Sequence, residues 1–262
     1  MARKTMKFSC FILAFATMAP QPAAAQELPA GDRNISIGVG IQTKPVYPGA
    51  DSNRFAFFPR IDVWRDGEPI IAKSPDESFG PSLIGKRSGR FAAGPTLNIA
   101  ATRSADDLPG LAKIGFGIEA GAFAEAWPLG PLRLRGELRQ GIGAHKALTG
   151  DLAADFVWRR GKEGPIFTAG PRVRWGSAKH NRAYFGVPAG AATALSPYEP
   201  GAGIYAVGAA AGLRYPLNRT VGLYGFAGYD RLTGKAADSP IVTAGSTDQF
   251  SGGIALTYRF GL

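Results

Sequence analysis

The last thirteen residues of the chain, 250–262, alternate between two kinds of side chain with a period of two. One set is apolar and ends in aromatic residues: Phe250, Gly252, Ile254, Leu256, Tyr258, Phe260 and Leu262. The other set is small or polar: Ser251, Gly253, Ala255, Thr257, Arg259 and Gly261. Successive side chains of an extended chain point to opposite faces, so this stretch predicts a strand with one apolar and one polar face.

The start of the chain has the three parts of an export signal. Arg3, Lys4 and Lys7 form a positive region, residues 8–18 form an apolar core, and residues 23–25 (AAA) offer an A-x-A cleavage site. The core is too short to cross a membrane as a helix. We therefore expect 1–25 to be a cleaved signal peptide of the Sec pathway. Residues 26–262 would form a single domain.

Composition narrows the class of the mature chain. The mean hydropathy of all 262 residues is −0.04, and the mature part has no apolar run of eighteen residues, which excludes a helical membrane protein. A transmembrane β-barrel still fits, because its strands are only half apolar. An aromatic-tipped C-terminal strand on an exported chain is typical of such a barrel. The location expected is the outer membrane of a Gram-negative bacterium.

Charge and cysteine content limit the partners and the chemistry. Without residues 1–25 the chain would keep 27 basic and 20 acidic residues, a net charge of +7. Export argues against nucleic acid, so membrane lipid, lipopolysaccharide and murein are the partners expected for this charge. The one cysteine, Cys10, lies in the signal. The mature chain therefore has no thiol for a disulfide, a nucleophile or a metal site.

Alternating segments recur along the mature chain, separated by clusters of Gly, Pro, Asn and Asp. Twelve strands are predicted, at 34–43, 54–65, 68–73, 79–86, 90–101, 114–127, 130–142, 149–160, 164–177, 203–216, 219–232 and 249–260. The segments 68–73 and 79–86 could be one interrupted strand, and ten strands is the alternative. Long connections fall at 43–53, 102–113, 178–202 and 233–248, all on one side of an antiparallel barrel, as in outer-membrane proteins.

Charged side chains alternate with apolar ones in several of these strands. An Arg or Lys facing lipid at mid-depth costs roughly 2–4 kcal/mol, so the charged row must face the lumen. The residues are Arg60, Asp62, Glu119, Arg133, Arg135, Glu137, Arg139, Asp155, Arg172 and Arg174. They could pair across the interior and fill it, or they could line an anion-selective constriction.

Tryptophans give a further expectation. Trp64, Trp127, Trp158 and Trp175 each fall at or near the end of an expected strand. Interfacial aromatic girdles occupy such positions in membrane barrels, so we expect these four side chains to lie in a girdle.

Catalytic signatures are weak. His145 and His180 lie in or beside loops, without another His, Asp or Glu at metal-ligand spacing. There is no G-x-S-x-G motif, so only an unusual arrangement around His180 would support an enzyme. We therefore expect no catalytic residues, no metal and no cofactor.

Several short segments resemble the MipA/OmpV family of outer-membrane proteins, the MltA-interacting proteins. The first lies near the start of the mature chain, at 45–51 (PVYPGAD). The others follow in order: 184–187 (YFGV), 198–201 (YEPG), 229–232 (YDRL), 237–242 (ADSPIV) and 258–260 (YRF). In the fifth segment, Asp238, Ser239 and Pro240 form a turn that either fixes a loop over the barrel mouth or contacts a partner.

The resemblance implies a scaffold without catalytic residues. A family member is regarded as bridging a murein lytic transglycosylase and a murein synthase. The alternative function is a narrow pore for small, anionic solutes. That alternative depends on the arginines of the charged row: Arg133, Arg135, Arg139, Arg172 and Arg174.

Overall fold

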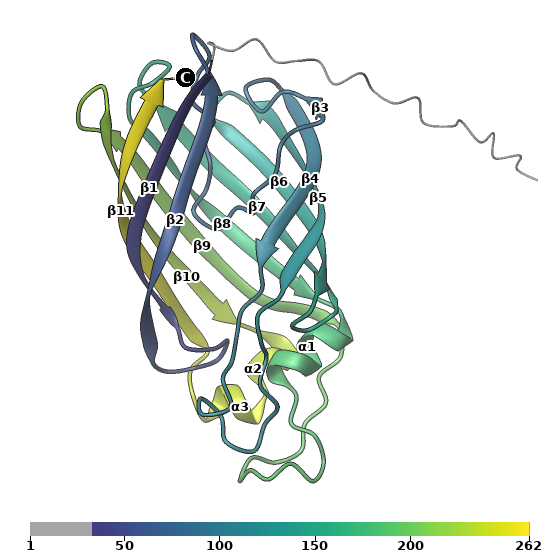
Figure 1. Cartoon of the computed structure of the whole chain (residues 1–262). Helices are drawn as coiled ribbons and strands as arrows, with labels where there is room; N and C mark the ends of the chain where they lie inside the picture. Colours follow the sequence, from purple (N-terminus) through teal and green to yellow (C-terminus); the bar gives the residue numbers. More distant parts are fainter. Residues whose placement is uncertain (1–32, 262) are drawn as a thin grey trace, which may run out of the picture. The chain divides into compact units, whose positions relative to one another are not determined.

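A computed structural model describes residues 33–261, and the expected signal peptide lies outside them. The described chain forms one antiparallel sheet of eleven strands, which curls into a barrel (Figure 1). The order of neighbours is β2-β1-β11-β10-β9-β8-β7-β6-β5-β4-β3. The expected all-β antiparallel barrel is confirmed, and β1 pairs with β11 from Asn34 opposite Gly261 to Thr43 opposite Gly252.

The first half of the sheet consists of β1 (Arg33–Pro45), β2 (Asn53–Arg65), β3 (Ile84–Gly85), β4 (Phe91–Ile99), β5 (Ile118–Leu129) and β6 (Leu132–Ile142). The second half consists of β7 (Leu148–Arg159), β8 (Ile166–Gly176), β9 (Gly203–Pro216), β10 (Val221–Leu232) and β11 (Asp248–Gly261). Three short helices are α1 (Ala178–Phe185), α2 (Gly234–Ala237) and α3 (Pro240–Thr243). In the part of the chain that the structure describes, no helix is long and apolar enough to span a membrane.

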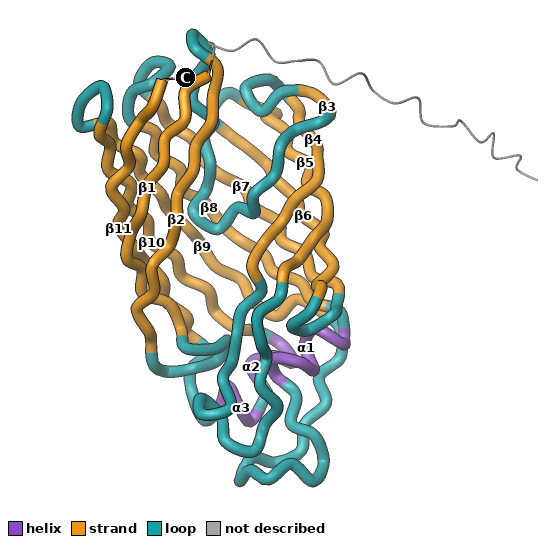
Figure 2. Tube along the Cα trace, viewed as in Figure 1, coloured by secondary structure: helices purple, strands orange, loops and turns teal. Residues whose placement is uncertain are grey.

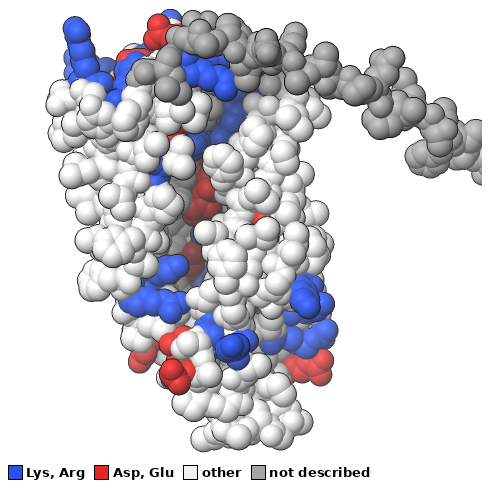
Figure 3. All heavy atoms as spheres, in the orientation of Figure 1, with Lys and Arg blue, Asp and Glu red and all other residues white. Residues whose placement is uncertain are grey.

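The period of two explains why these segments are strands. In β6, Leu134 and Leu138 point outward and are 42% and 52% exposed, whereas Arg133, Arg135 and Arg139 are buried in the interior. On the face that Figure 3 shows, the outer wall on either side of a central slit is almost free of charge between the two ends of the barrel. An apolar band over a polar interior is the arrangement of a membrane barrel.

The two ends of the barrel differ. Short turns join the strands at the end where the chain's C-terminus lies, and long connections with all three helices lie at the opposite end (Figure 2). Outer-membrane barrels have short turns in the periplasm and long loops outside, so we assign the helical end to the cell exterior. We call α1, α2, α3 and the connections around them the cap.

The number of strands differs from the expected twelve. Residues 68–73 form no strand, and of 79–86 only Ile84 and Gly85 belong to one, with an isolated bridge from Phe79 to Leu97. Residues 66–78, which we call the inner segment, fold into the lumen instead, whereas residues 79–83 follow the edge of β4 with Phe79 and Leu83 exposed. Pro69 and Pro75 interrupt the inner segment, and proline cannot donate to a ladder. Ile70 and Ala72 are buried against Trp64, so their alternation reflects packing inside the barrel.

The inner segment leaves an incomplete wall. Of the described strands, β2 and β3 end the sheet, so the outer edge of β2 faces β4 and the inner segment without a shared ladder. We call the gap between β2 and β4 the seam. Figure 3 shows it as a vertical slit in which acidic and basic side chains of the interior are visible from the side.

The girdle prediction is wrong for two of the four tryptophans. Trp64 is buried with Ile70, Val157 and Ile166 inside the barrel, and Trp127 packs against the same cluster. The two residues sit near the short-turn end, where the inner segment supplies an apolar core. Trp158 does point outward and is 47% exposed.

Candidate functional site: the charged lumen and the vestibule

The centre of the lumen is built around Arg133, which is wholly buried. Its guanidinium donates to the Ala72 carbonyl at 2.7 Å, to Ser74 Oγ at 2.6 Å and to Asp155 Oδ2 at 2.9 Å. It also donates to Glu77 Oε2 at 3.0 Å. Strand β6 therefore holds the inner segment through the single guanidinium of Arg133, which donates hydrogen bonds to three residues of that segment.

Two arginines of β8, which is separated from β6 by β7 alone, hold the same segment. Arg172 Nε donates to Asp76 at 2.8 Å, and its guanidinium also pairs with Asp155 at 2.8 Å. Arg174 contacts Asp76 at 3.0 Å, Asp151 at 3.1 Å and Asp230 at 3.0 Å. Residues 72–78 are thus held against the inner side of the wall formed by β6, β7 and β8.

The remaining charges of the expected row also face inward and are paired. Arg135 contacts Glu137 at 2.8 Å, and Arg139 contacts Glu119 at 2.8 Å. Arg60 contacts Asp62 at 3.1 Å. Ion pairs connect eight of the ten into one network of buried or half-buried residues: Glu119, Arg133, Arg135, Glu137, Arg139, Asp155, Arg172 and Arg174. Arg60 and the buried Asp62 form a separate pair. Arg60 is half-buried and lies over the Tyr224 ring at 3.7 Å.

Sequence reasoning missed several partners of these arginines. Asp151 and Glu125 share strand faces with Asp155 and Glu119, so the period of two could have found both. Asp76 and Glu77 lie on the inner segment, which has no regular period. No local signal could have placed them in the lumen. Arg87, which contacts Glu77 and Glu125, follows β3 and was missed for the same reason.

The cap closes the other half of the barrel. Ser177 caps α1 by accepting from the His180 backbone N–H at 3.4 Å, and Tyr184 donates its hydroxyl to the Ala101 carbonyl at 2.8 Å. Ser239 Oγ donates to the Phe185 carbonyl at 2.7 Å and accepts from the Ile241 N–H at 3.2 Å. Ser239 is wholly buried, so it connects α1 with the start of α3.

The two neighbours of Ser239 have simpler places. Asp238 is exposed and forms the C-cap of α2, while Pro240 begins α3. In the closing strand, Tyr258 and Phe260 point outward and are 49% and 46% exposed. The turn thus fixes a loop of the cap, and the two aromatic residues lie on the lipid-facing side.

The structure brings the two histidines together beneath the cap. The rings of His145 and His180 have centroids 5.1 Å apart, and His145 Nε2 lies 3.0 Å from Glu119 Oε1. The His180 ring contacts the Asn181 amide oxygen at 3.1 Å. Ser177 reaches the backbone of His180 and not its ring. Within residues 33–261, no group of three or more His, Cys, Asp or Glu side chains is arranged to hold a metal.

Burial of His180 makes the cap sensitive to acid. Burial lowers the pKa of His180 to about 4, below its ordinary value of 6.5. An opened cap would protonate His180 below pH 6.5, whereas the packed cap would not until about pH 4. The stability of the cap is therefore complete above pH 6.5 and decreases as the pH falls toward 4.

We expect α1 to become more susceptible to pepsin between pH 6 and pH 4.5, measured as the rate of cleavage within residues 178–202 after correction for the enzyme's own pH profile. His180→Gln removes the titrating group and should flatten this dependence. An equally steep dependence in the variant would contradict the assignment to His180.

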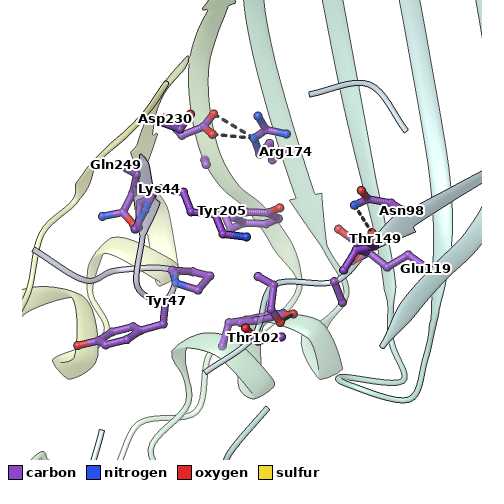
Figure 4. Close-up of a pocket in the computed structure, with 18 of the residues that line it drawn as sticks. Lys44, Tyr47, Asn98, Thr102, Glu119, Thr149, Arg174, Tyr205, Asp230 and Gln249 are labelled. Atoms are coloured by element: carbon purple, nitrogen blue, oxygen red, sulfur yellow. Dashed lines mark hydrogen bonds and ion pairs between the residues drawn. The ribbon is translucent and has the colours of Figure 1, made fainter. Parts of the chain in front are cut away.

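Between the cap and the paired charges lies a cavity of about 540 Å³, which we call the vestibule. Figure 4 shows its walls: Tyr47 and Thr102 come from connections of the cap, and Lys44, Gln249 and Tyr205 come from strands. The carboxylates that line it, Glu119, Asp151 and Asp230, all contact arginines. The vestibule is thus a chamber with mixed apolar and polar walls and a closed charge network as its floor.

An apolar outer wall, a charged and occupied interior, and one end with short turns define an outer-membrane β-barrel protein with a plugged lumen. The chain belongs to the MltA-interacting protein MipA family, whose model matches residues 37–260. The expected family is confirmed. Among curated proteins, none matches the chain.

Three solved structures are distantly similar to the chain. An outer membrane channel from Pseudomonas putida F1 is 12% identical, with a TM-score of 0.42 over 92% of this chain and 100% of that one. The translocator domain of the autotransporter NalP from Neisseria meningitidis is 13% identical, with a TM-score of 0.38 over 90% of both chains. OprG from Pseudomonas aeruginosa is 11% identical, with a TM-score of 0.24 over 88% of this chain and 98% of that one.

Proposed function

We propose that this protein is a non-enzymatic interaction protein of the outer membrane, which holds murein-remodelling enzymes such as a lytic transglycosylase and a murein synthase. The observation that carries the proposal is membership of a family described as MltA-interacting. The occupied lumen supports the proposal. Ion pairs and the inner segment fill the interior, so the surfaces at the two ends are left for binding a partner.

A partner in the periplasm would meet the short-turn end. Exposed basic side chains gather there on several turns: Arg65, Lys86, Arg90, Arg160, Lys162 and Arg219. Exposed or half-exposed acids on these turns are fewer, namely Asp66, Glu68 and Glu163. Complementary charge steers partners and orients their docking, so we assign the partner an acidic surface.

The alternative, a narrow pore for small anions, depended on five lumen arginines. Arg133, Arg135, Arg139, Arg172 and Arg174 each contact carboxylates at 2.8–3.1 Å. Their charge is therefore compensated within the barrel, and the inner segment lies across the path. This geometry favours the interaction protein over the pore.

The test is crosslinking in the native envelope, followed by affinity purification and mass spectrometry of retained proteins. The wild-type chain should retain a lytic transglycosylase or a murein synthase that an unrelated barrel of similar size does not retain. Charge reversal of Arg160, Lys162 and Arg219 to glutamate should abolish this retention.

The matched control reverses Lys179 and Arg182, which are exposed on α1 at the opposite end. This control should retain the partner as the wild type does. The proposal would be overturned if the wild-type chain retained no protein that the unrelated barrel does not also retain. If only the α1 control lost the partner, the contact would lie at the cap end instead of the short-turn end.

A further inference from the structure

The seam is bridged by side chains. Arg54 of β2 donates to the Thr102 hydroxyl at 3.1 Å, and Lys73 of the inner segment donates to the Ile61 carbonyl at 3.1 Å. Lys73 also lies 3.4 Å from Asp62. Among the described residues, the other neighbouring strands are joined by a ladder of backbone hydrogen bonds. At the seam, these side-chain contacts take the place of the ladder. A small change at the seam therefore opens the wall without breaking a ladder.

The vestibule extends into the seam. Its lining includes Phe57 of β2 and Ile99 of β4, whose side chains are 79% and 66% exposed on the outer face of the barrel. Phe58, the next residue of β2, lines the same cavity from the inside. The chamber thus has an apolar mouth that opens sideways, toward the hydrocarbon of the membrane.

Two cations lie inside this mouth. Lys44 and Arg54 are register partners across β1 and β2, both on the inward face, and both line the vestibule. Like charges directly opposite each other on a strand pair destabilise it. Among residues 33–261, neither cation has a carboxylate within ion-pair distance, and the acids of the vestibule contact Arg139 and Arg174 instead. This pair therefore provides an uncompensated positive site.

We propose that the vestibule binds a single-chain amphipathic anion, which enters sideways through the seam. Its carboxylate or phosphate head would lie between Lys44 and Arg54, and its apolar tail would extend past Phe57, Phe58 and Ile99. A chamber of about 540 Å³ is within the roughly 300–1,000 Å³ of small-molecule sites, and it suits one chain. This activity goes beyond the proposed function, since it uses the opposite half of the barrel from the basic turns.

The experiment uses the full-length protein in phosphatidylcholine vesicles and a dodecanoate with a photoreactive diazirine at the end of its chain. Crosslinked residues are identified by mass spectrometry. Unlabelled dodecanoate, dodecyl phosphate and dodecanol then compete with the probe. Lys44→Gln and Arg54→Gln test the head site. The control is Arg33→Gln, which removes an arginine of β1 at the short-turn end, outside the vestibule.

The probe should label Phe57, Phe58 or Ile99, and both anionic competitors should displace it at lower concentration than dodecanol. Stronger displacement by dodecanoate would identify the head as a carboxylate, and stronger displacement by dodecyl phosphate would identify it as a phosphate. Each single variant should weaken binding about tenfold, or about 1.4 kcal/mol, because it removes a charge-assisted hydrogen bond to the head. The control should bind as the wild type does.

Two results would overturn the proposal. One is labelling spread evenly over the outer strands or confined to the cap, which would show that the tail does not occupy the seam. The other is equal competition by dodecanol with unchanged binding in both single variants. Resistance to unfolding in detergent before heating shows that each variant is folded, so that a loss of binding is attributable to the site.

Discussion

Replacing Arg133 with alanine is expected to lower the free energy of unfolding by about 3–5 kcal/mol, because removal of one partner leaves buried charges uncompensated. Arg133 is fully buried, and Glu77 and Asp155 would lose their contacts at 3.0 Å and 2.9 Å. The measurement is equilibrium unfolding by urea in lipid vesicles, followed by tryptophan fluorescence and by electrophoretic mobility of the folded barrel.

A matched control is Arg182→Ala. Arg182 pairs with Glu199 at 3.2 Å, but their side chains are 47% and 78% exposed. Exposed pairs contribute about 0–1 kcal/mol, so this variant should unfold nearly as the wild type does. Combining Arg133→Met with Asp155→Asn removes one charge of each sign and leaves Arg172 its contact with Asp76, so this double variant should recover part of the stability lost in Arg133→Ala. A loss below about 1 kcal/mol in Arg133→Ala would mean that the network does not stabilise the barrel.

The second large effect concerns conduction. Replacing residues 74–78 (SPDES) with a Gly-Ser linker of equal length should convert a barrel without measurable conductance into a channel with discrete current steps. The change removes Asp76 and Glu77 and leaves Arg133, Arg172 and Arg174 with fewer carboxylates. The open lumen should therefore favour anions over cations.

Single-channel recording in planar bilayers measures both properties, with the reversal potential in a salt gradient giving the selectivity. The control is the same replacement at residues 188–192, an exposed part of the cap connection. It should remain closed. Wild-type steps as large as those of the lumen variant would contradict a plugged lumen and would restore the anion pore as the leading hypothesis.

Much of the wall could be predicted from the sequence because the period of two is a local property. The strand expected at 203–216 is β9 as observed, and the strand expected at 219–232 begins two residues later as β10. The inward face of β6 followed from the cost of placing Arg133 or Arg135 in lipid. The same local rule led to error at 68–73, where Ile70 and Ala72 alternate because they pack inside the lumen.

The candidate sites were less predictable, for a physical reason. Which charges meet across a barrel depends on the stagger and tilt of the strands, which no single strand encodes. The contact of Arg174 with Asp230 joins residues 56 positions apart, and that of Arg172 with Asp76 joins residues 96 apart. Lys44 and Arg54 lie opposite each other because of the register of one hairpin. That their charges are uncompensated can be recognised only when the partners of every nearby acid are known.

The seam also determines how this barrel responds to force. A tube that is slit along its length keeps most of its resistance to bending but loses most of its resistance to torsion, because its two edges can slide past each other. Here the sliding edges are β2 and β4, and the crosspieces that oppose the motion are Arg54 and Lys73. A twist imposed by lateral pressure in the membrane, or by a partner at the short turns, is therefore concentrated at one line of the wall.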